Sequence, residues 1–463
     1  MRTRPAWILA MMMIAAGCGG GDGGGKDAGT DPGLDVPAID PGMPDPGGPG
    51  DAGRPDAGAY DDAVGDTPGP DDVPPAPDAG DVPPEDTGPD TGLDAWVHPC
   101  PRVPGPDDAV RKVVVSLPFA AGGGKSNRFA VLDLATDGTL TPTGTTFDLG
   151  RRFMGDIAFT KDGRVGLVAT EEGRLGVFRF EDDGSVTVVD PGFQGAFYAS
   201  DVVMDPYVSD RAWVLNAQWR ENGGGVYAVR IDCDGTPIDE GMAAAGRIVA
   251  TLQFANGDPG KAMAGALDIL DSPAGDTAHL LSFDGTPFRR GGANAFGDGY
   301  ASISCGAVTR DGRFLLLGDN QEYGNPDLPN RVAVVQASED GMTPRQVLTP
   351  MQDPIAILSS PYGDAMLVVS GYGNDAFVVT YDAQADPPFV DTGAVPWGES
   401  GKPQLPGGAA MVERGAAKGL VLVTEVRGIR TLRFQGDGTV VDLGLTSLGE
   451  GVADMPGAIG VQP

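Results

Sequence analysis

Residues 156–189 read DIAFTKDGRVGLVATEEGRLGVFRFEDDGSVTVV, and this stretch decides the fold. Its short apolar runs are Ile157–Phe159, Val165–Ala169, Leu175–Phe180 and Val186–Val189. The turn sequences Lys-Asp-Gly-Arg (161–164) and Asp-Asp-Gly (182–184) separate the first run from the second and the third from the fourth. Runs of β-branched and aromatic residues between such turns are typical of strands. Four strands joined in this way predict one blade of a β-propeller.

The same unit recurs along the chain. A second clear copy begins at Cys305 and repeats the turn as Arg-Asp-Gly-Arg at 310–313. The copies are spaced about fifty residues apart, as blades are. Further copies begin near Val202, Leu267, Ile355 and Ala410.

The two ends of the repeat region predict how the ring closes. The chain enters at Arg111 on what reads as a second strand, and residues 456–461 read as an innermost strand with no blade after it. The C-terminal strand therefore completes the first blade, and closure removes exposed sheet edges. We expect an all-β, seven-bladed propeller of four-stranded blades over residues 111–463. Because the copy between Leu267 and Tyr300 is irregular, counts of six and eight stay open.

The blade pattern over residues 111–463 resembles the YVTN and lactonase-type seven-bladed propellers, which include 6-phosphogluconolactonase-like proteins. That group contains hydrolases, surface-layer proteins and uncharacterised exported proteins, so the resemblance implies an architecture and leaves the activity open. No lactonase catalytic motif maps onto a residue of this chain, and no catalytic residue is assigned.

The N-terminus predicts export and lipidation. Arg2 and Arg4 precede the apolar run Ala6 to Ala16, which is typical of a signal peptide and too short to span a bilayer. Ala-Ala-Gly-Cys at 15–18 resembles the lipobox of bacterial lipoproteins. Residues 1–17 are therefore the predicted signal peptide, and Cys18 is the predicted lipid anchor of a protein of the bacterial cell envelope. Which membrane leaflet holds the anchor stays open.

A linker and an arm precede the propeller. Residues 18–96 consist mainly of Gly, Asp, Pro and Ala and cannot bury a core, so we expect a disordered spacer. Calcium binding by its aspartates is a weaker alternative, because they lack the fixed spacing of a calcium loop. Residues 97–110 form the predicted arm. The net charge of −33 disfavours nucleic acid as a partner and limits membrane contact to the lipid.

We expect the two sets of connections in each blade to lie on opposite faces of the ring. Those between strands one and two and between strands three and four are short turns, and we name their side the turn face. The remaining connections are longer and polar, and their side is the loop face. Loops on a rigid scaffold commonly carry function, which makes the loop face the predicted binding face. Its candidate residues are Trp219, Arg220, Glu221, Asp319, Asn320, Glu322, Tyr323, Asp327, Tyr372, Asp375, Glu425 and Arg427.

Two of these loops suggest specific chemistry. The loop from Asp319 to Asp327 gathers oxygen ligands and Tyr323, which could suit calcium or a sugar, although a solvated Asn-Pro-rich loop explains the same residues. Trp219 and Arg220 are of types enriched at interface hot spots, although Trp219 could instead fold over its own blade.

Cysteines and histidines constrain the chemistry. With Cys18 lipidated, three cysteines remain, and the direction of the arm favours a disulfide between Cys100 and Cys233. His98 and His279 lie far apart and do not suggest a zinc site. No nucleophile elbow or Cys-His pair is found, and no cofactor is predicted.

Three functions follow as hypotheses. The first is a binding or scaffold propeller for a protein or an envelope glycan, which makes an enzyme the less favoured class. The second is a lactonase-like or other hydrolase of a small sugar derivative in the central funnel, which inward-pointing carboxylates would favour. The third is a structural surface protein without a discrete ligand.

Overall fold

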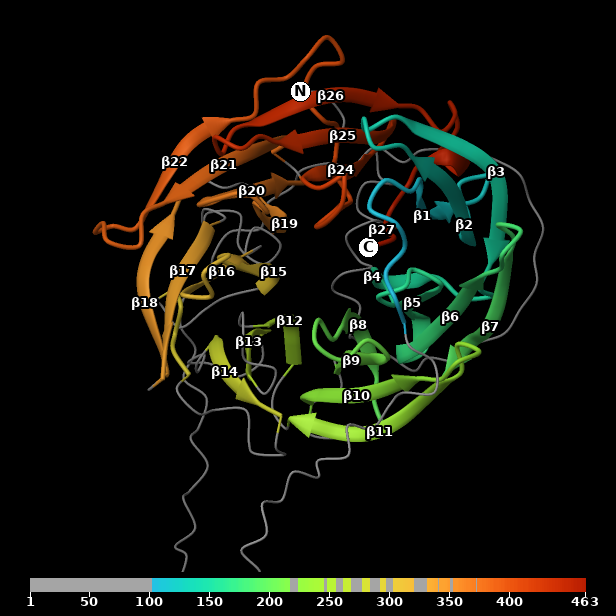
Figure 1. The fold of residues 1–463 in the computed structure, drawn as a ribbon, viewed down its shortest axis with the longest axis horizontal. Coiled ribbons are helices and arrows are strands. Elements are labelled where there is room, and N and C mark those ends of the chain that lie inside the picture. The colour runs from blue at the N-terminus through green and yellow to red at the C-terminus, as the bar shows by residue number, and fades with distance from the viewer. Residues whose placement is uncertain are drawn as a thin grey trace, which may run out of the picture. The chain divides into compact units, whose positions relative to one another are not determined.

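The computed structural model describes residues 102–216, 224–244, 248–254, 261–267, 277–283, 292–296, 303–319, 331–339, 341–349, 353–371 and 373–463. These residues form seven antiparallel sheets arranged around one axis (Figure 1). Six sheets have four strands, and the fourth around the ring has three among the described residues. The prediction of a seven-bladed β-propeller is confirmed.

The first four blades, each written from the innermost strand outwards, have the following strands. Blade one contains β27 (Ile459–Val461), β1 (Arg111–Phe119), β2 (Lys125–Leu134) and β3 (Leu140–Asp148). Blade two contains β4 (Phe153–Phe159), β5 (Val165–Thr170), β6 (Arg174–Phe180) and β7 (Val186–Phe193). Blade three contains β8 (Ala199–Met204), β9 (Arg211–Asn216), β10 (Val226–Ile231) and β11 (Pro237–Ala244). Blade four contains β12 (Ile248–Phe254), β13 (Lys261–Leu267) and β14 (Ala278–Ser282).

The last three blades follow the same order, and two single-turn 3₁₀ helices complete the described elements. Blade five contains β15 (Ile303–Val308), β16 (Phe314–Asp319), β17 (Arg331–Ser338) and β18 (Gly341–Leu348). Blade six contains β19 (Pro354–Ser359), β20 (Ala365–Ser370), β21 (Asp375–Tyr381) and β22 (Phe389–Ala394). Blade seven contains β23 (Gly408–Met411), β24 (Leu420–Glu425), β25 (Gly428–Phe434) and β26 (Val440–Thr446). The helices are η1 (Glu171–Gly173) and η3 (Val452–Asp454).

The C-terminal strand closes the ring as predicted. β27 pairs antiparallel with β1, so that Val113 lies opposite Val461 and Val115 opposite Ile459. Pro463 adds a second attachment, because its carbonyl oxygen accepts from Arg111 Nη1 at 2.6 Å and from Arg414 Nη2 at 2.9 Å. The first blade therefore joins the two ends of the propeller.

Blade four begins earlier than the sequence predicted. Its innermost strand is β12, and Leu267 ends β13, where it pairs with Ile248. The connection after β12 reads ANGDPG at 255–260 and does not repeat the Asp-Gly-Arg turn that marks other blades, so the turn pattern could not locate this strand. Beyond β14, Ala293 forms a single bridge with Ala278 in the position of a fourth strand.

Seven apolar clusters hold the ring, one between each pair of neighbouring blades. Between blades two and three, for example, Leu167 and Val177 pack with Val214 and Val229. The second strands β5, β16, β20 and β24 are buried at every residue, because neighbouring blades cover both of their sides. Each fully buried aliphatic side chain stabilises the fold by about 1.5–3 kcal/mol.

The predicted signal peptide, Cys18, the linker and residues 97–101 of the arm lie outside the described residues, and their assignments stay predictions. Within the described ranges, no helix is long and apolar enough to cross a membrane.

Candidate functional site

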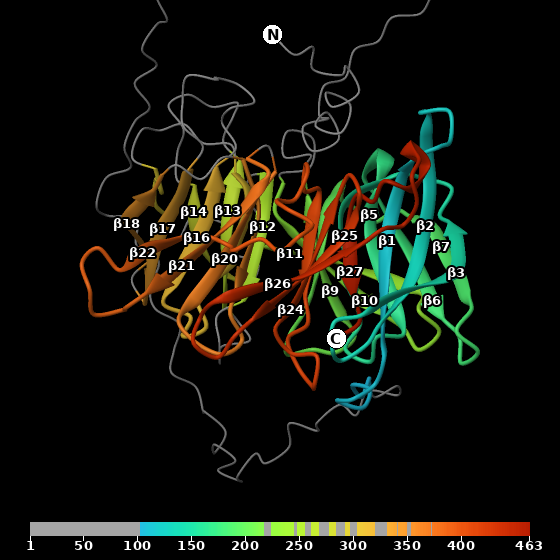
Figure 2. The same ribbon diagram turned by 90° about the horizontal axis from the view of Figure 1, so that it is seen from above.

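Figure 2 turns the ring by 90°, so that the connections on its two faces are seen at opposite ends of the strands. The turn face is built from repeated local hydrogen bonds. In the β4–β5 turn, Thr160 Oγ1 donates to Asp162 Oδ1 at 2.6 Å, and Thr309 and Asp311 repeat this bond in blade five. Gly163 has φ +71, a value that favours glycine over any residue with a Cβ. These turns therefore use much of their polar surface internally.

Many predicted loop-face residues cannot be placed. The candidates that lie outside the described residues are Trp219, Arg220, Glu221, Asn320, Glu322, Tyr323, Asp327 and Tyr372. The described candidates are Asp319, Asp375, Glu425 and Arg427. Three of these four are buried acids at strand ends, and their role in binding stays a prediction.

Asp319 ends β16 and closes the base of its loop. Its side chain is fully buried, and Arg331 Nε, at the start of β17, donates to Asp319 Oδ2 at 2.9 Å. The Arg331 guanidinium also lies 4.6 Å from the centre of the Phe296 ring. This ion pair joins the two strands where the loop leaves the blade.

Asp375 begins β21 and holds the connection between blades six and seven. Trp397 Nε1 donates to Asp375 Oδ1 at 2.8 Å, and the Lys402 ammonium pairs with Asp375 Oδ2. Asn374 lies beside it with φ 52, and its Oδ1 accepts from the Leu405 N–H at 2.6 Å. The connection is therefore held at several points along its length.

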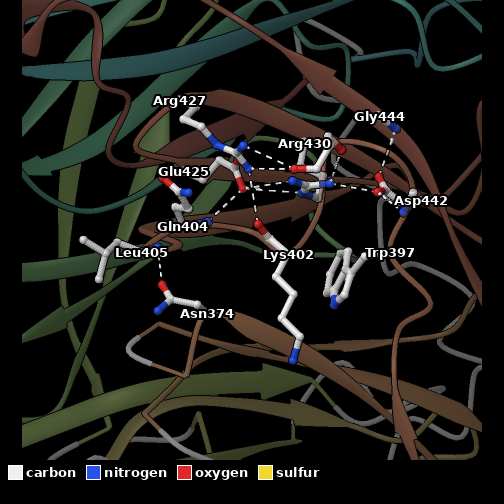
Figure 3. A network of polar contacts seen from close by, with 12 residues as sticks. Asn374, Trp397, Lys402, Gln404, Leu405, Glu425, Arg427, Arg430, Asp442 and Gly444 are labelled. Carbon is white, nitrogen blue, oxygen red and sulfur yellow. Dashed lines mark hydrogen bonds and ion pairs between the residues drawn. The ribbon is translucent and has the colours of Figure 1, made fainter.

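Glu425 is the centre of an ion-pair network in blade seven (Figure 3). Its carboxylate pairs with Arg427 at 3.0 Å and Arg430 at 3.4 Å, and it also accepts from the Gln404 N–H at 3.0 Å. Arg430 is fully buried, pairs with Asp442 at 2.8 Å, and lies 5.2 Å from the centre of the Trp397 ring. The expected long loop is short here, since only Val426 and Arg427 separate β24 from β25.

The sequence analysis missed Arg430, Asp442, Lys402 and Trp397. Arg430 lies in β25 next to the buried residue Ile429 and two positions before the buried residue Leu432, and a cation that is buried there requires paired carboxylates. That position in the strand was the one feature of the sequence that could have revealed the network.

Two carboxyl groups from neighbouring blades meet on the inner wall of the ring. The Asp156 N–H of β4 donates to Asp201 Oδ1 of β8 at 2.9 Å. Burial raises the pKa of Asp156 to about 6, and burial with the nearby Asp156 charge raises the pKa of Asp201 to about 7. Asp156 is exposed to solvent, and Asp201 is half-buried. Such a pair can hold and release a proton near neutral pH.

Ser304 and Cys305 lie on another innermost strand, β15. Ser304 Oγ donates to the Pro354 carbonyl oxygen at 2.5 Å. Burial raises the pKa of the Cys305 thiol to about 12, and the charges of Asp353 and Asp156 act in the same direction. Cys305 is a free thiol and stays protonated at neutral pH, which does not suit a nucleophile.

The described part of the chain contains no group of three or more His, Cys, Asp or Glu side chains that could hold a metal ion. The calcium hypothesis concerned a loop that begins at Asp319 and continues outside the described residues. It stays a prediction.

The arm reaches the third blade on the turn face. Arg102 Nη2 donates to the carbonyl oxygens of Ile231 and Asp232, and Arg102 Nη1 pairs with Asp162 at 3.3 Å. Cys233 follows directly and takes part in a disulfide. Its partner lies outside the described residues, so the pairing with Cys100, two residues before Arg102, stays a prediction.

No protein-family model and no curated protein matches the sequence. Among solved structures, the periplasmic gluconolactonase PpgL of Pseudomonas aeruginosa superposes with a TM-score of 0.52 at 14% identity and covers 77% of this chain and 99% of its own. A Bacteroides fragilis protein provisionally described as a 6-phosphogluconolactonase gives a TM-score of 0.51 at 13% identity, with the same coverage. The chain therefore has the seven-bladed fold of the lactonase-type propellers that its repeats resemble.

Proposed function

We propose that this chain is a binding propeller of the bacterial cell envelope, anchored by a lipid on Cys18, which recognises a protein or an envelope glycan through its loop face. The ion-pair network of blade seven is the observation that supports recognition. It fixes a polar surface on which the Lys402 side chain is 60% exposed and the Arg427 side chain is 35% exposed. Side chains that are held in place before a partner arrives lose less entropy on binding.

The anchor and linker fit this role. A lipid with several acyl chains on Cys18 would hold the protein stably at a membrane. The acidic linker of nearly eighty residues would then keep the propeller tens of ångströms from the lipid headgroups. Replacing Cys18 with Ala in the producing bacterium should abolish incorporation of labelled palmitate and release the protein from membranes. Retention of the label by the variant would contradict the anchor.

Capture of an envelope partner tests the binding face. Glu399 is exposed three residues before Lys402, in the same connection between β22 and β23. The full-length protein is compared with the variants Lys402→Gln and Glu399→Lys for what each retains from a solubilised envelope fraction. Lys161→Gln is the matched control, because Lys161 is exposed on the turn face. We expect both loop-face variants to retain several-fold less of a partner that the control retains fully. Equal capture by all four proteins would exclude this part of the loop face.

A hydrolase of sugar lactones is the second candidate, and the Asp156–Asp201 pair is the observation that favours it. Such a pair could hold and release a proton during hydrolysis, since burial raises the pKa values of both carboxyl groups towards neutrality. Hydrolysis of a gluconolactone above its spontaneous rate, lost in Asp156→Asn and Asp201→Asn, would support this activity. A rate equal to the spontaneous rate would reject it.

A further inference from the structure

Four cations lie together on the loop face of blades one and two, and we name them the basic ridge. Lys125 begins β2, Arg151 and Arg152 form the connection from β3 to β4, and Arg174 begins β6. Helix η1 supplies the two carboxylates in their midst, Glu171 and Glu172.

The carboxylates do not neutralise the ridge. Glu171 pairs with Arg152 at 3.2 Å and Lys125 at 3.6 Å, while Glu172 pairs with Arg151 and, at 3.6 Å, with Arg174. Each carboxylate therefore faces two cations, which leaves positive charge on an otherwise acidic protein. The Arg151 guanidinium, through its hydrogen bond and its charge, lowers the pKa of Glu172, which shows the sign of the local field.

The ridge has a constrained backbone. Glu172 has φ 65, which costs a residue with a Cβ about 1 kcal/mol or more. Arg151 and Arg174 both pair with this residue, so their guanidinium groups lie close together at the surface.

An aromatic ring borders the ridge. A Cβ on Gly173 would lie 2.2 Å from the Tyr198 ring, so that ring packs flat against the chain between Glu172 and Arg174. Tyr198 is half-buried and precedes β8 in the connection between blades two and three. A flat apolar surface beside planar guanidinium groups suits a saccharide ring that carries a carboxylate, since guanidinium binds carboxylate through two parallel hydrogen bonds.

We propose that the basic ridge binds an anionic, carboxylate-bearing glycan of the cell envelope, with the uronate carboxylates on Arg151, Arg174 and Lys125 and a sugar ring against Tyr198. This proposal rests on the proposed function and gives the protein a second contact surface. That surface is distinct from the one around Lys402 and Arg427, which we call the Lys402 region. The net charge of −33 repels polyanions at long range, so binding depends on close contacts and weakens as salt rises.

Polygalacturonate is the probe for this site, and its methyl-esterified form is the matched neutral ligand with the same backbone. Binding to the full-length protein is measured by calorimetry at several salt concentrations. We expect the double variant Lys125→Gln/Arg151→Gln to weaken polygalacturonate binding by roughly tenfold or more, because it loses two of the four cations. Glu172→Gln should instead strengthen binding several-fold. An improved affinity cannot come from misfolding.

The controls separate this inference from the proposed function. Lys161→Gln and Lys402→Gln should bind polygalacturonate as the unaltered protein does. Equal binding of the esterified polymer, or no effect of the ridge variants, would overturn the ridge as a carboxylate site while leaving capture through the Lys402 region intact. Equal binding of poly-glutamate would overturn the assignment to a glycan.

Discussion

Replacing Arg430 with Met tests the ion-pair network that shapes the loop face. Arg430 is fully buried and its guanidinium donates at 2.8 Å both to Asp442 and to Ser400 Oγ. It also pairs with Glu425 at 3.4 Å. Met fills a similar volume without charge, so the variant mainly removes the cation that two buried carboxylates share.

The expected loss follows from that geometry. Removing one partner of a buried ion pair costs about 3–5 kcal/mol, because the remaining charge is left without compensation. Loss of the contact with Trp397 adds to this, since a desolvated cation–π contact contributes about 2 kcal/mol. We expect Arg430→Met to lower the free energy of unfolding by about 4 kcal/mol or more.

Urea unfolding followed by tryptophan fluorescence measures the change, with Arg427→Met as the control. Arg427 pairs with the same Glu425 carboxylate, but its side chain is 35% exposed, so its loss should cost about 1 kcal/mol. If Arg430→Met costs no more than Arg427→Met, then burial does not set the strength of the network and the reasoning fails.

Four further predictions concern the axis, the closure and the cysteines. The pKa of Asp201 is raised to about 7 in the folded protein, so folding takes up a proton between about pH 4 and 7. The stability that this proton contributes is present in acid and is lost as pH rises through 7. Asp201→Asn should flatten that dependence in urea titrations at pH 5 and 8, and an unchanged slope would refute it. Removing residues 459–463 deletes β27 and should lower the free energy of unfolding by roughly 5 kcal/mol in the same assay, because a buried strand and its hydrogen bonds are lost. A decrease below about 1 kcal/mol would mean that the ring does not depend on this closure. Peptide mapping without reductant should yield Cys100 linked to Cys233, and any other pairing would reject it. Iodoacetamide at pH 8 should leave Cys305 unmodified until the protein is denatured, because the thiol pKa of about 12 keeps it protonated.

The architecture could be predicted because each blade encodes it locally. The Asp-Gly-Arg turns at 162–164 and 311–313 mark the first hairpin of their blades, and the apolar runs between turns become strands. The closure by β27 followed from counting strands at the two ends. The sequence pattern placed the start of blade four too late, because residues 255–260 do not contain the Asp-Gly-Arg turn.

The site could not be predicted in the same way, because its contacts join distant positions. Asp156 and Asp201 lie 45 residues apart and meet only when blades two and three are adjacent. Arg430 and Asp442 lie on neighbouring strands, and their meeting depends on the register across a β-bulge between Thr431 and Leu432. Without the register, the sequence does not show which carboxylate each cation meets.

The contrast between the two faces bears on where recognition occurs. On the turn face, Asp137, Asp183 and Asp437 each accept a hydrogen bond from the residue two positions on, so different blades present nearly the same turn. On the loop face, ion pairs differ from blade to blade: Asp319 with Arg331 in blade five, and Glu425 with Arg430 in blade seven. A partner can distinguish positions around a near-symmetric ring only where the blades differ. This contrast between repeated turns and differing connections favours the loop face as the recognition surface that we propose.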